Sequence, residues 1–284
     1  MLKKLQVLIF CSILFSTTTF AWNSIGHRLV AQIAYDQLTP QAKAKVDALT
    51  AVMFHSPYGD ARFARAAVWP DQYRHKNTST FTWHFIDMPI VKDNVKAPTP
   101  SQYNVVWGIT QAEKTLENSA GNMYERARSL SFLVHFIGDI HQPLHCVSLY
   151  NTHFPSGDRG GNDYAIHSPV ANNLHGLWDE GAGLFARNPV KYQFHYDEIQ
   201  KLATNWTRQY PRSFFASRLK EQSPMQWAQE SHRIAEFAYT TPVDAAPSDV
   251  YVQQSQAEVR EQIVLAGDRL ADVLNRTLTR VSTY

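Results

Sequence analysis

The sequence predicts a mainly helical, all-α protein. Three observations support this fold class. Apolar residues recur at intervals of three and four over most of the chain, which is the period of one face of an α-helix. Prolines interrupt these stretches at points where helices would end. Two His-Asp pairs, His135 with Asp139 and His175 with Asp179, are separated by four residues, which is about one helical turn.

Residues 1–21 have the features of a secretory signal peptide. A start with two lysines is followed by a largely apolar run from Leu5 to Phe15, and small and polar residues precede Ala21. The apolar run is too short to span a bilayer as an anchor, and no later stretch is long and apolar enough to cross one. We therefore expect cleavage after Ala21, export to the periplasm or outside the cell, and a single domain over 22–284.

The exported chain would carry almost no net charge. The sequence has 27 Lys and Arg against 25 Asp and Glu, and loss of two lysines with the signal peptide leaves 25 of each sign. The chain thus lacks the basic surface typical of proteins that bind duplex DNA. Cys146 is the only cysteine after residue 21, so no intrachain disulfide can form. We interpret Cys146 as a small buried thiol rather than a metal ligand, because free cysteines are usually buried.

The first half of the chain contains several predicted helices. Ile25, Leu29 and Ile33 mark one face of a first helix, which the pair Thr39-Pro40 ends. The other elements expected in this half are a helix over 41–51, a short helix over 61–68 that stops before Pro70, a short strand or extended loop over 81–87, and a long helix over 101–116.

The second half begins with a helix predicted over 124–140. This helix is apolar around Leu130, Leu133, Val134 and Ile137, so we expect it to be central and buried. A long loop rich in Gly, Asn, Asp, Ser and Pro follows, and loops of this length inside a domain are often functional. The ranges expected for the loop and the remaining helices are 146–172 for the loop and 173–186, 192–208, 224–240 and 252–278 for the helices.

The run from His135 to His145 is the densest group of candidate metal ligands. His135 and Asp139 would project from one face of a helix, and His145 follows Pro143, where that helix should have ended. Imidazole and carboxylate are the ligands that zinc takes when a site must hold water and act as a Lewis acid. A polar cluster inside an apolar helix is costly unless its members are paired or bind metal, which favours metal binding.

Other candidates are ambiguous when taken alone. Asp71 follows Trp69-Pro70 and could be a turn or helix-cap residue. His84 lies in an apolar surround, which argues against a solvent-facing role. Trp22 would become the N-terminal residue after cleavage. Its free amine and carbonyl oxygen could chelate a metal together with His27, or its side chain could simply anchor the new terminus.

At these residues the sequence resembles the zinc-dependent single-strand-specific nucleases of fungi and their plant and bacterial relatives, the S1/P1 type. The resemblance covers essentially the whole chain after residue 21. Its motifs are Trp22, Gly26-His27, Trp69-Pro70-Asp71, Trp83-His84-Phe85-Ile86-Asp87, the run from His135 to His145, Gly160-Gly161-Asn162-Asp163, and Leu174-His175-Gly176-Leu177-Trp178-Asp179.

The resemblance implies a phospholipase C/nuclease-like helical fold with three zinc ions at the base of a cleft, and it assigns nine ligands in three sets. The first set is Asp71, His84, His135 and Asp139. The second is the amine and carbonyl of Trp22, with His27 and the other oxygen of Asp139. The third is His145, His175 and Asp179.

The resemblance also implies roles in catalysis and substrate binding. Asp71, Asp139 and Arg74 are expected to act in catalysis, Arg74 facing phosphate where the fungal enzymes have lysine. Phe85 is expected to stack on a base, Asp87 to contact its edge and Asn162 to contact the nucleotide. Two features depart from the family. The fungal disulfides cannot form here, and Asp158-Arg159 does not map onto the family's loop. His141 competes with His145 on composition, and the family pattern favours His145.

These features together predict a secreted zinc-dependent endonuclease. It would hydrolyse single-stranded DNA and RNA to products with 5′-phosphates, and the resemblance also implies a 3′-nucleotidase activity. A weaker resemblance extends to secreted zinc phospholipases C, which tend to have glutamate where this chain has Asp179. A non-catalytic zinc-binding protein of the envelope is the third alternative. The sequence implies neither a protein partner nor a stable membrane anchor.

Overall fold

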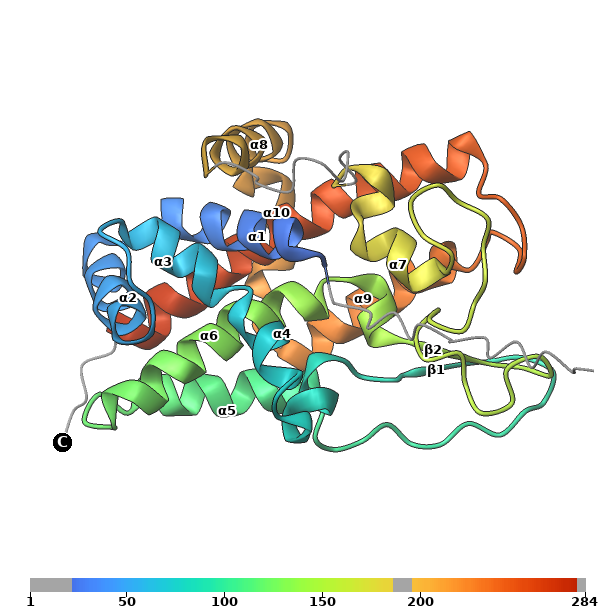
Figure 1. Cartoon of the computed structure of the whole chain (residues 1–284), viewed down its shortest axis with the longest axis horizontal. Helices are drawn as coiled ribbons and strands as arrows, with labels where there is room; N and C mark the ends of the chain where they lie inside the picture. The colour runs from blue at the N-terminus through green and yellow to red at the C-terminus, as the bar shows by residue number, and fades with distance from the viewer. Residues whose placement is uncertain (1–21, 186–195, 280–284) are drawn as a thin grey trace, which may run out of the picture.

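The computed structural model describes residues 22–185 and 196–279, and it confirms the mainly helical fold (Figure 1). The predicted signal peptide and the expected start of a helix at 192 lie outside the described residues. The α-helices are α1 (Ser24–Asp36), α2 (Pro40–Met53), α3 (Gly59–Ala66), α4 (Trp69–Arg74), α5 (Val105–Glu117), α6 (Met123–Ile140), α7 (Leu174–Asp179), α8 (Tyr196–Gln209), α9 (Pro224–Ala238) and α10 (Asp249–Thr279).

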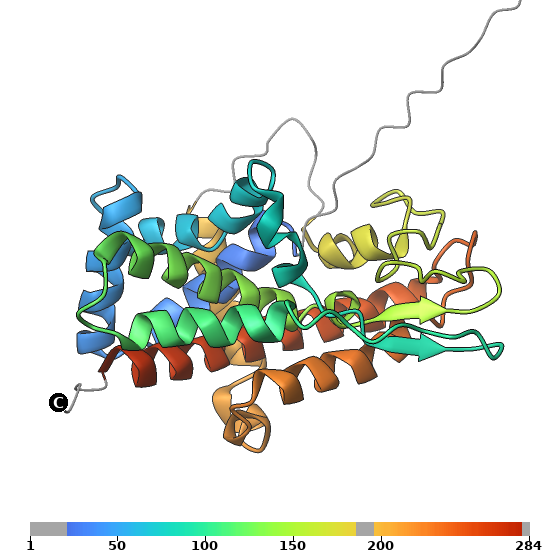
Figure 2. The same ribbon diagram turned by 90° about the horizontal axis from the view of Figure 1, so that it is seen from below.

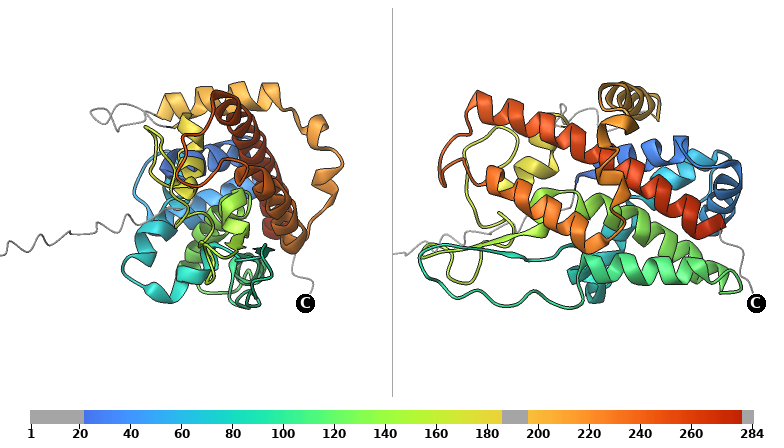
Figure 3. Two further views of the ribbon diagram at one scale, coloured as in Figure 1. Left: turned by 90° about the vertical axis from the view of Figure 1, so that its right-hand side faces the viewer. Right: turned by 180° about the vertical axis from the view of Figure 1, so that it is seen from behind.

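Helix α6 is the centre of the fold. Every residue from Leu130 to Tyr150 is buried, which confirms the prediction of a central helix in this region. Helices α5 and α2 pack on α6, and α1, α3 and α10 also contact it. The long α10 runs along the length of the molecule, beside α1 and behind α6 (Figures 2 and 3). The C-terminal half of α6 is thus enclosed by helices from both ends of the chain.

Asparagine side chains fix the starts of several helices. Asn23, Asn104, Asn122 and Asn173 each accept hydrogen bonds from the first backbone N–H groups of α1, α5, α6 and α7. Asparagine is among the strongest N-cap residues because its short side chain satisfies donors that the helix leaves unpaired. Three of these caps, at α1, α6 and α7, begin helices that carry predicted metal ligands.

The segment around Pro70 differs from the prediction. A helix was expected to stop before this proline, and α3 does end at Ala66. A further helix that was not predicted, α4, then begins at Trp69, with Pro70 in its first turn. Proline suits this position because the first helical N–H groups have no partner within the helix. Asp71 is therefore a residue of the first turn of α4.

Two other elements also differ from their predicted form. The expected strand or loop over 81–87 is a 3₁₀-helix up to His84, η1 (Thr78–His84), and becomes extended only at Phe85. Asn77 starts η1 by accepting from the N–H of Ser79. The helix expected over 173–186 ends at Asp179. Left-handed backbone at Gly181 and Ala182 breaks it there into a short 3₁₀ turn, η3 (Gly181–Gly183).

The long loop predicted over 146–172 contains a strand. After the 3₁₀ turn η2 (Pro143–Cys146), β2 (Ser148–Tyr150) pairs in parallel with β1 (Pro89–Val91). The rest of the loop is held by Asp158, which is fully buried. Its carboxylate accepts from the N–H of Leu149 at 2.8 Å and from the hydroxyl of Tyr239 at 2.7 Å. Asp158, which the family pattern did not explain, therefore has a structural role in this loop.

Across residues 22–185 and 196–279, none of the helices has the length and apolar character needed to cross a membrane. Cys146 is fully buried, and its thiol faces the carbonyl oxygen of Ile140 at 3.4 Å. This position agrees with its interpretation as a buried thiol.

Candidate metal centre and adjoining cavity

Eight predicted ligand side chains meet at one place in the fold. They come from α1, α4, η1, α6, η2 and α7, and each is at most 6% exposed. Their ligand atoms form three groups in which every atom lies within 4.8 Å of the others. These groups are His27, Asp71 and His135; His84, His135 and Asp139; and His145, His175 and Asp179.

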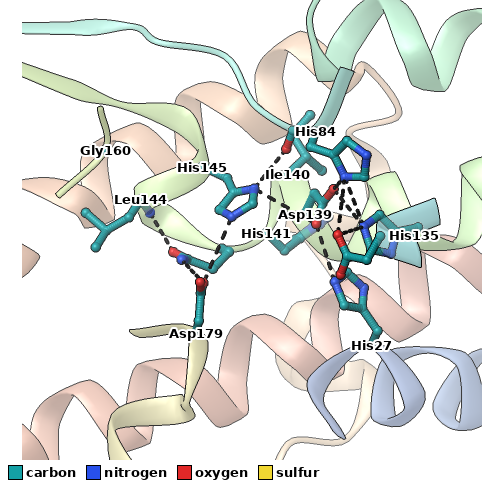
Figure 4. Close-up of polar contacts among 12 residues, drawn as sticks. His27, His84, His135, Asp139, Ile140, His141, Leu144, His145, Gly160 and Asp179 are labelled. Carbon is teal, nitrogen blue, oxygen red and sulfur yellow. Dashed lines mark hydrogen bonds and ion pairs between the residues drawn. The ribbon is translucent and has the colours of Figure 1, made fainter. Parts of the chain in front are cut away.

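Asp139 is the link between two parts of this cluster (Figure 4). Its Oδ2 faces Nδ1 of His84 at 3.0 Å and Nε2 of His135 at 3.3 Å. Its Oδ1 faces Nε2 of His27 on the other side, at 3.4 Å. One carboxylate oxygen is thus directed to each of two groups, which is the arrangement that a carboxylate bridging two cations requires.

Asp71 completes the group around Oδ2 of Asp139. Its Oδ1 lies 3.5 Å from Nε2 of His135 and 3.9 Å from Nδ1 of His84. Zinc bonds to nitrogen and oxygen of about 2.0–2.2 Å in a tetrahedron place neighbouring ligand atoms about 3.3–3.6 Å apart. The separations in this group lie close to that range, so its size suits a small divalent cation.

The third group lies on the side of Asp139 that faces η2 and α7. Nε2 of His175 is 3.4 Å from Oδ2 of Asp179, and Nε2 of His145 is 4.0 Å from Oδ1 of the same carboxylate. The two rings are 5.0 Å apart and tilted by 34°. His145 is therefore the histidine of its run that joins this group. His141 instead points away and is fully buried, where its Nε2 meets the guanidinium of Arg269 at 2.9 Å.

Three of the histidines are oriented by backbone carbonyl groups. The Nδ1–H of His135 donates to the carbonyl of Ala67 at 2.7 Å, that of His145 to the carbonyl of His84 at 2.8 Å, and that of His175 to the carbonyl of Gly160 at 2.6 Å. Because a carbonyl oxygen can only accept, each Nδ1 must carry the proton. Each Nε2 is then the unprotonated nitrogen that faces the carboxylates, as in most histidine metal ligands.

Gln142 is a supporting residue that the sequence did not predict. It is fully buried, and its Nε2 donates to Oδ1 of Asp179 at 2.7 Å while its Oε1 accepts from the N–H of Leu144 at 2.6 Å. The amide thereby fixes the carboxylate of Asp179 relative to η2. Its position between His141 and Pro143, inside a run of ligands, was the only available signal.

Burial and mutual repulsion keep most of these imidazoles neutral. Burial, together with neighbouring histidines, lowers the pKa values of His27, His84 and His145 well below the ordinary value. Burial lowers the pKa of His175 to about 4. Neutral imidazole is the form that binds metal. Burial also acts to lower the pKa of His135, but the carboxylates of Asp139 and Asp71 outweigh it and raise that pKa.

The donor set fits metal cations. Burial raises the pKa values of Asp139 and Asp179 well above the ordinary range, so their carboxylates need nearby positive charge to be ionised here. Several of the converging atoms are buried without a hydrogen-bond partner among the described residues. They are both ring nitrogens of His27, Nε2 of His145, Oδ1 of Asp71 and Oδ1 of Asp139. Divalent cations would satisfy ligand atoms and carboxylates together, and imidazole nitrogen with carboxylate oxygen is a donor set that zinc, among other divalent metals, accepts.

The N-terminal segment is packed against this centre. Trp22 is fully buried, with its indole edge-on to Phe185. The N–H of Asn23 donates to the carbonyl of Asp179 at 2.9 Å, and its side-chain amide donates to Glu180 at 2.8 Å. These contacts join the start of α1 to the end of α7, so Trp22 lies beside two predicted ligand helices.

Glycine at position 138 allows α1 to approach α6. A Cβ atom at Gly138 would lie 2.8 Å from Nδ1 of His27, which is too close for unbonded atoms. The absence of a side chain lets the ring of His27 stack on that of His135, with centroids 3.9 Å apart. The spacing of the candidate ligands therefore depends on this glycine as well as on the ligands themselves.

A cavity of about 240 Å³ adjoins the third group. It is lined by the ligands His145 and His175 and by all four residues predicted to bind substrate, Arg74, Phe85, Asp87 and Asn162. Three further residues that line it, Phe81, Leu144 and Arg159, were not predicted to bind substrate. Phe81 is 48% exposed and meets Phe85 edge-on at 5.5 Å, and Arg159 is 68% exposed on the loop whose role was open.

Three polar side chains of this cavity are held or influenced by their neighbours. Nε of Arg74 lies 3.3 Å from Oδ1 of Asp71, which places a guanidinium between the metal cluster and the cavity. The side-chain amide of Asn162 donates to the carbonyl of Arg159 at 2.7 Å, which directs its orientation. Burial and the nearby carboxylate of Asp158 raise the pKa of Asp87 to about 6.

Comparison with known proteins agrees with this geometry. The family model for S1/P1 nuclease matches residues 22–279, which is nearly the whole chain. The chain belongs to the S1/P1 nuclease family. The family resemblance predicted from the motifs is thereby confirmed. Members of this family are nucleases, and this chain is accordingly a nuclease of the hydrolase class.

Relatives in plants and fungi extend over most of the chain. Endonuclease 3 of Arabidopsis thaliana is 29% identical over 277 residues, covering 90% of this chain and 88% of the relative. Nuclease S1 of Aspergillus oryzae is 27% identical over 282 residues, covering 89% of this chain and 90% of the relative. Nuclease P1 of Penicillium citrinum is 30% identical over 175 residues, which is 56% of this chain. The similarity to S1/P1 nucleases thus spans the metal cluster and the cavity together.

Proposed function

We propose that this S1/P1 nuclease is an exported, zinc-dependent endonuclease that cleaves single-stranded DNA and RNA to products with 5′-phosphates. The observation that supports this most is the contact between the metal cluster and the Phe85 cavity, which share His145 and His175. A nucleoside held in the cavity would place its 3′-phosphate beside the cluster. The same geometry supports hydrolysis of nucleoside 3′-phosphates.

Different residues would bind the metal, pair with the phosphate and orient the ligands. Zinc, when bound, supplies hydroxide near neutral pH and stabilises negative charge on the phosphate and the leaving oxygen. Asp139 would hold two cations, because one of its oxygens faces His27 and the other faces His84. Arg74 lies beside Asp71 and lines the cavity, where its guanidinium can pair with a phosphate oxygen. Gln142 keeps the carboxylate of Asp179 in its ligand orientation.

The preference for single strands follows from the way the cavity would hold a base. Phe85 is half-buried at the cavity, with Phe81 edge-on to it. An aromatic ring can stack on the face of a base only when the base has left its duplex stack. Asp87 would accept hydrogen bonds from N–H groups on the base edge. Neither contact requires a particular sugar, which agrees with action on both DNA and RNA.

Export is part of the proposal. The sequence pattern of residues 1–21 supports a cleaved signal peptide, and cleavage after Ala21 would free the amine of Trp22. That amine and its carbonyl would complete the ligand set of His27 and Asp139. After residue 21 the chain has a single, buried cysteine, so no intrachain disulfide has to form after export.

The function is tested with Phe85→Ala on two substrates. Base stacking is worth about 1–3 kcal/mol, so the variant should lose roughly 5- to 150-fold in kcat/KM on single-stranded oligonucleotides. Hydrolysis of a small phosphodiester without a base should hardly change, because the metal cluster is intact. Equal losses on both substrates with a lowered melting temperature would mean that Phe85 is only a packing residue. Failure of the parent enzyme to cleave single strands, in the presence of zinc, would overturn the proposed function.

A further inference from the structure

A second and larger cavity opens onto the metal cluster from another side. Its volume is about 630 Å³, and Asp71 and Asp179 form part of its wall. The Phe85 cavity instead reaches the cluster through His145 and His175. None of the residues that line the two cavities is common to both. A strand whose phosphate lies at the cluster would thus have one cavity for each of the two nucleosides that this phosphate joins.

The second cavity contains a guanidinium, that of Arg28, which has no partner among the described residues. Arg28 lies four residues after Ser24 on α1, so both line the cavity from one face of the helix. Within residues 22–185 and 196–279, the side chain of Arg28 makes no hydrogen bond or ion pair, and its Nε is buried without an acceptor. Burial and the charge of Arg65 lower the pKa of Arg28, the direction expected when no carboxylate compensates its charge.

The rest of the wall suits a nucleotide without selecting its base. Val68, Val170 and Ala171 provide an apolar surface, and Gln72 and Asn172 provide exposed side-chain amides. Among the described lining residues none is aromatic, in contrast to the Phe85 cavity. Such a surface can contact a base or sugar but offers no stacking platform.

The acidic residues that line this cavity either belong to the groups of candidate metal ligands or accept a hydrogen bond. Asp71 and Asp179 belong to the metal groups. Glu180 accepts from the side-chain amide of Asn23 at 2.8 Å, and burial raises its pKa. Arg28 is therefore the group of this cavity best able to attract an anion. The anion that accompanies a nucleoside here is the next phosphate of the strand.

We infer that the second cavity is the subsite for the nucleotide on the 3′ side of the cleaved bond, and that Arg28 binds the phosphate that follows it. This inference rests on the proposed nuclease function. The leaving 3′-oxygen belongs to the nucleoside in the Phe85 cavity, so the nucleoside that keeps the 5′-phosphate must leave the cluster by another route. The second cavity provides that route. Arg28 would then favour oligonucleotides over nucleoside 3′-phosphates.

The test uses two trinucleotides whose second linkage resists cleavage and is charged in one and neutral in the other. Both have a natural first linkage. In one, the second linkage is a 3′-methylene phosphonate, which resists cleavage and keeps its negative charge; in the other it is a neutral methylphosphonate. The parent enzyme should cleave the charged trinucleotide with a kcat/KM about 10-fold higher, as expected for one hydrogen-bonded ion pair near the surface. Arg28→Gln should bring this ratio close to one, and Arg28→Lys should retain part of it.

Arg233→Gln is the matched control, because Arg233 is an exposed arginine on α9 and lines neither cavity. It should keep the parent's ratio. Hydrolysis of nucleoside 3′-phosphates should be the same in all of these variants, since such substrates do not reach Arg28. In binding measurements with an uncleavable single strand, Arg28→Gln should reduce the slope of log affinity against log salt by about 0.7.

The outcomes separate the inference from the function on which it rests. A parent enzyme that cleaves both trinucleotides equally well, or an Arg28→Gln variant that keeps the parent's ratio, would overturn the role of Arg28 and leave the nuclease function standing. A parent enzyme that cleaves neither trinucleotide and no longer single strand would overturn the nuclease function itself. Melting temperatures of the variants should not fall below that of the parent, since the guanidinium of Arg28 makes no hydrogen bond or ion pair among the described residues.

Discussion

Asp139 is the residue on which the largest part of the candidate centre depends. It is fully buried on α6, and its two oxygens face different histidines, His27 on one side and His84 with His135 on the other. A change at this side chain would alter two metal positions at once. The side-chain amide of Gln142, by contrast, donates to one ligand, Asp179, and so supports only the third group.

Asp139→Asn tests this bridging role. The amide nearly conserves the volume of the side chain but has one oxygen and no charge, so it cannot serve two cations. Loss of an outer-shell partner of a metal ligand typically costs 10- to 100-fold. Loss of the bridge should cost more than about 100-fold in kcat, with less metal bound per chain by elemental analysis. Asp249→Asn, which changes an exposed carboxylate at the start of α10, is the control. Near-normal turnover with full metal content would rule out the bridge.

Asp87 gives the cavity a pH dependence of its own. Burial, with the nearby charge of Asp158, raises its pKa to about 6. The carboxylate is therefore mostly ionised above pH 7 and mostly protonated at pH 5. Protonation removes acceptors for N–H groups on the base, so the advantage of a substrate with a base should decline as the pH falls through 6.

The measurement is the ratio of kcat/KM for an oligonucleotide to that for a base-free phosphodiester, from pH 5 to 8. Titration of the metal cluster affects both substrates and cancels in this ratio. The ratio should rise with a midpoint near pH 6 in the parent and stay flat in Asp87→Asn. A midpoint that persists in Asp87→Asn would assign the titration to another group.

Elements from both halves of the chain must meet before the ligands come together. His27 lies on α1 and Asp179 on α7. The backbone hydrogen bond from the N–H of Asn23 to the carbonyl of Asp179 joins these two helices. The N-terminal segment is thus placed by its own packing, with the indole of Trp22 buried against Phe185. Its backbone amine can be a ligand only when no residue precedes it.

This placement predicts a specific effect of one extra residue before Trp22. The free amine would become an amide, which is a poor metal ligand, while the indole could still pack. The extended protein should keep its melting temperature within a few degrees, bind one metal ion fewer and lose most of its activity. Protease treatment that restores Trp22 as the first residue should restore both. Full activity and full metal content in the extended protein would show that Trp22 is only a packing anchor.

Helical periodicity predicted most of the elements, and local chemistry explains the exceptions. The central helix was predictable because Leu130, Leu133 and Ile137 repeat at the helical period and are all buried. α4 was missed because Pro70 was taken as a stop, although proline is equally suited to a first turn. η1 was missed because a cap at Asn77, rather than apolar periodicity, starts it. β1 and β2 are short strands whose pairing joins distant parts of the chain, which no local pattern reports.

The candidate site was predicted better than its surroundings. Its ligands occur in dense motifs, so their residue types and spacing were informative, and the structure brings all eight side chains together. For Gln142 the only signal was its position inside the run of ligands, and Arg28 gave none. The role of Gln142 depends on its hydrogen bond to Asp179, and that of Arg28 depends on its place in the wall of a cavity. Such roles depend on the fold and become visible only when distant segments are placed together.

At the scale of the whole molecule, the metal cluster joins the parts of the fold. Its ligand side chains come from six elements between Ser24 and Asp179, and all of them are buried. Two of them, His135 and Asp139, lie in the C-terminal half of the central helix. With the carboxylates of Asp139 and Asp179 at the centre of an apolar fold, the folded state needs cations to hold these groups ionised. Metal binding and folding should therefore be coupled.

Removal of metal is the test of this coupling. A ligand at 100 times its dissociation constant stabilises the folded state by about 2.7 kcal/mol per site. For a domain of this size, about 2–4 °C of melting temperature corresponds to each kcal/mol. Chelation should thus lower the melting temperature by at least about 5–10 °C and abolish nuclease activity, and zinc should restore both. Elemental analysis of the restored protein should give about three zinc ions per chain. A saturated content of one or none would contradict the three-metal centre. An unchanged melting temperature after complete metal removal would instead show that the cluster is built without help from its cations.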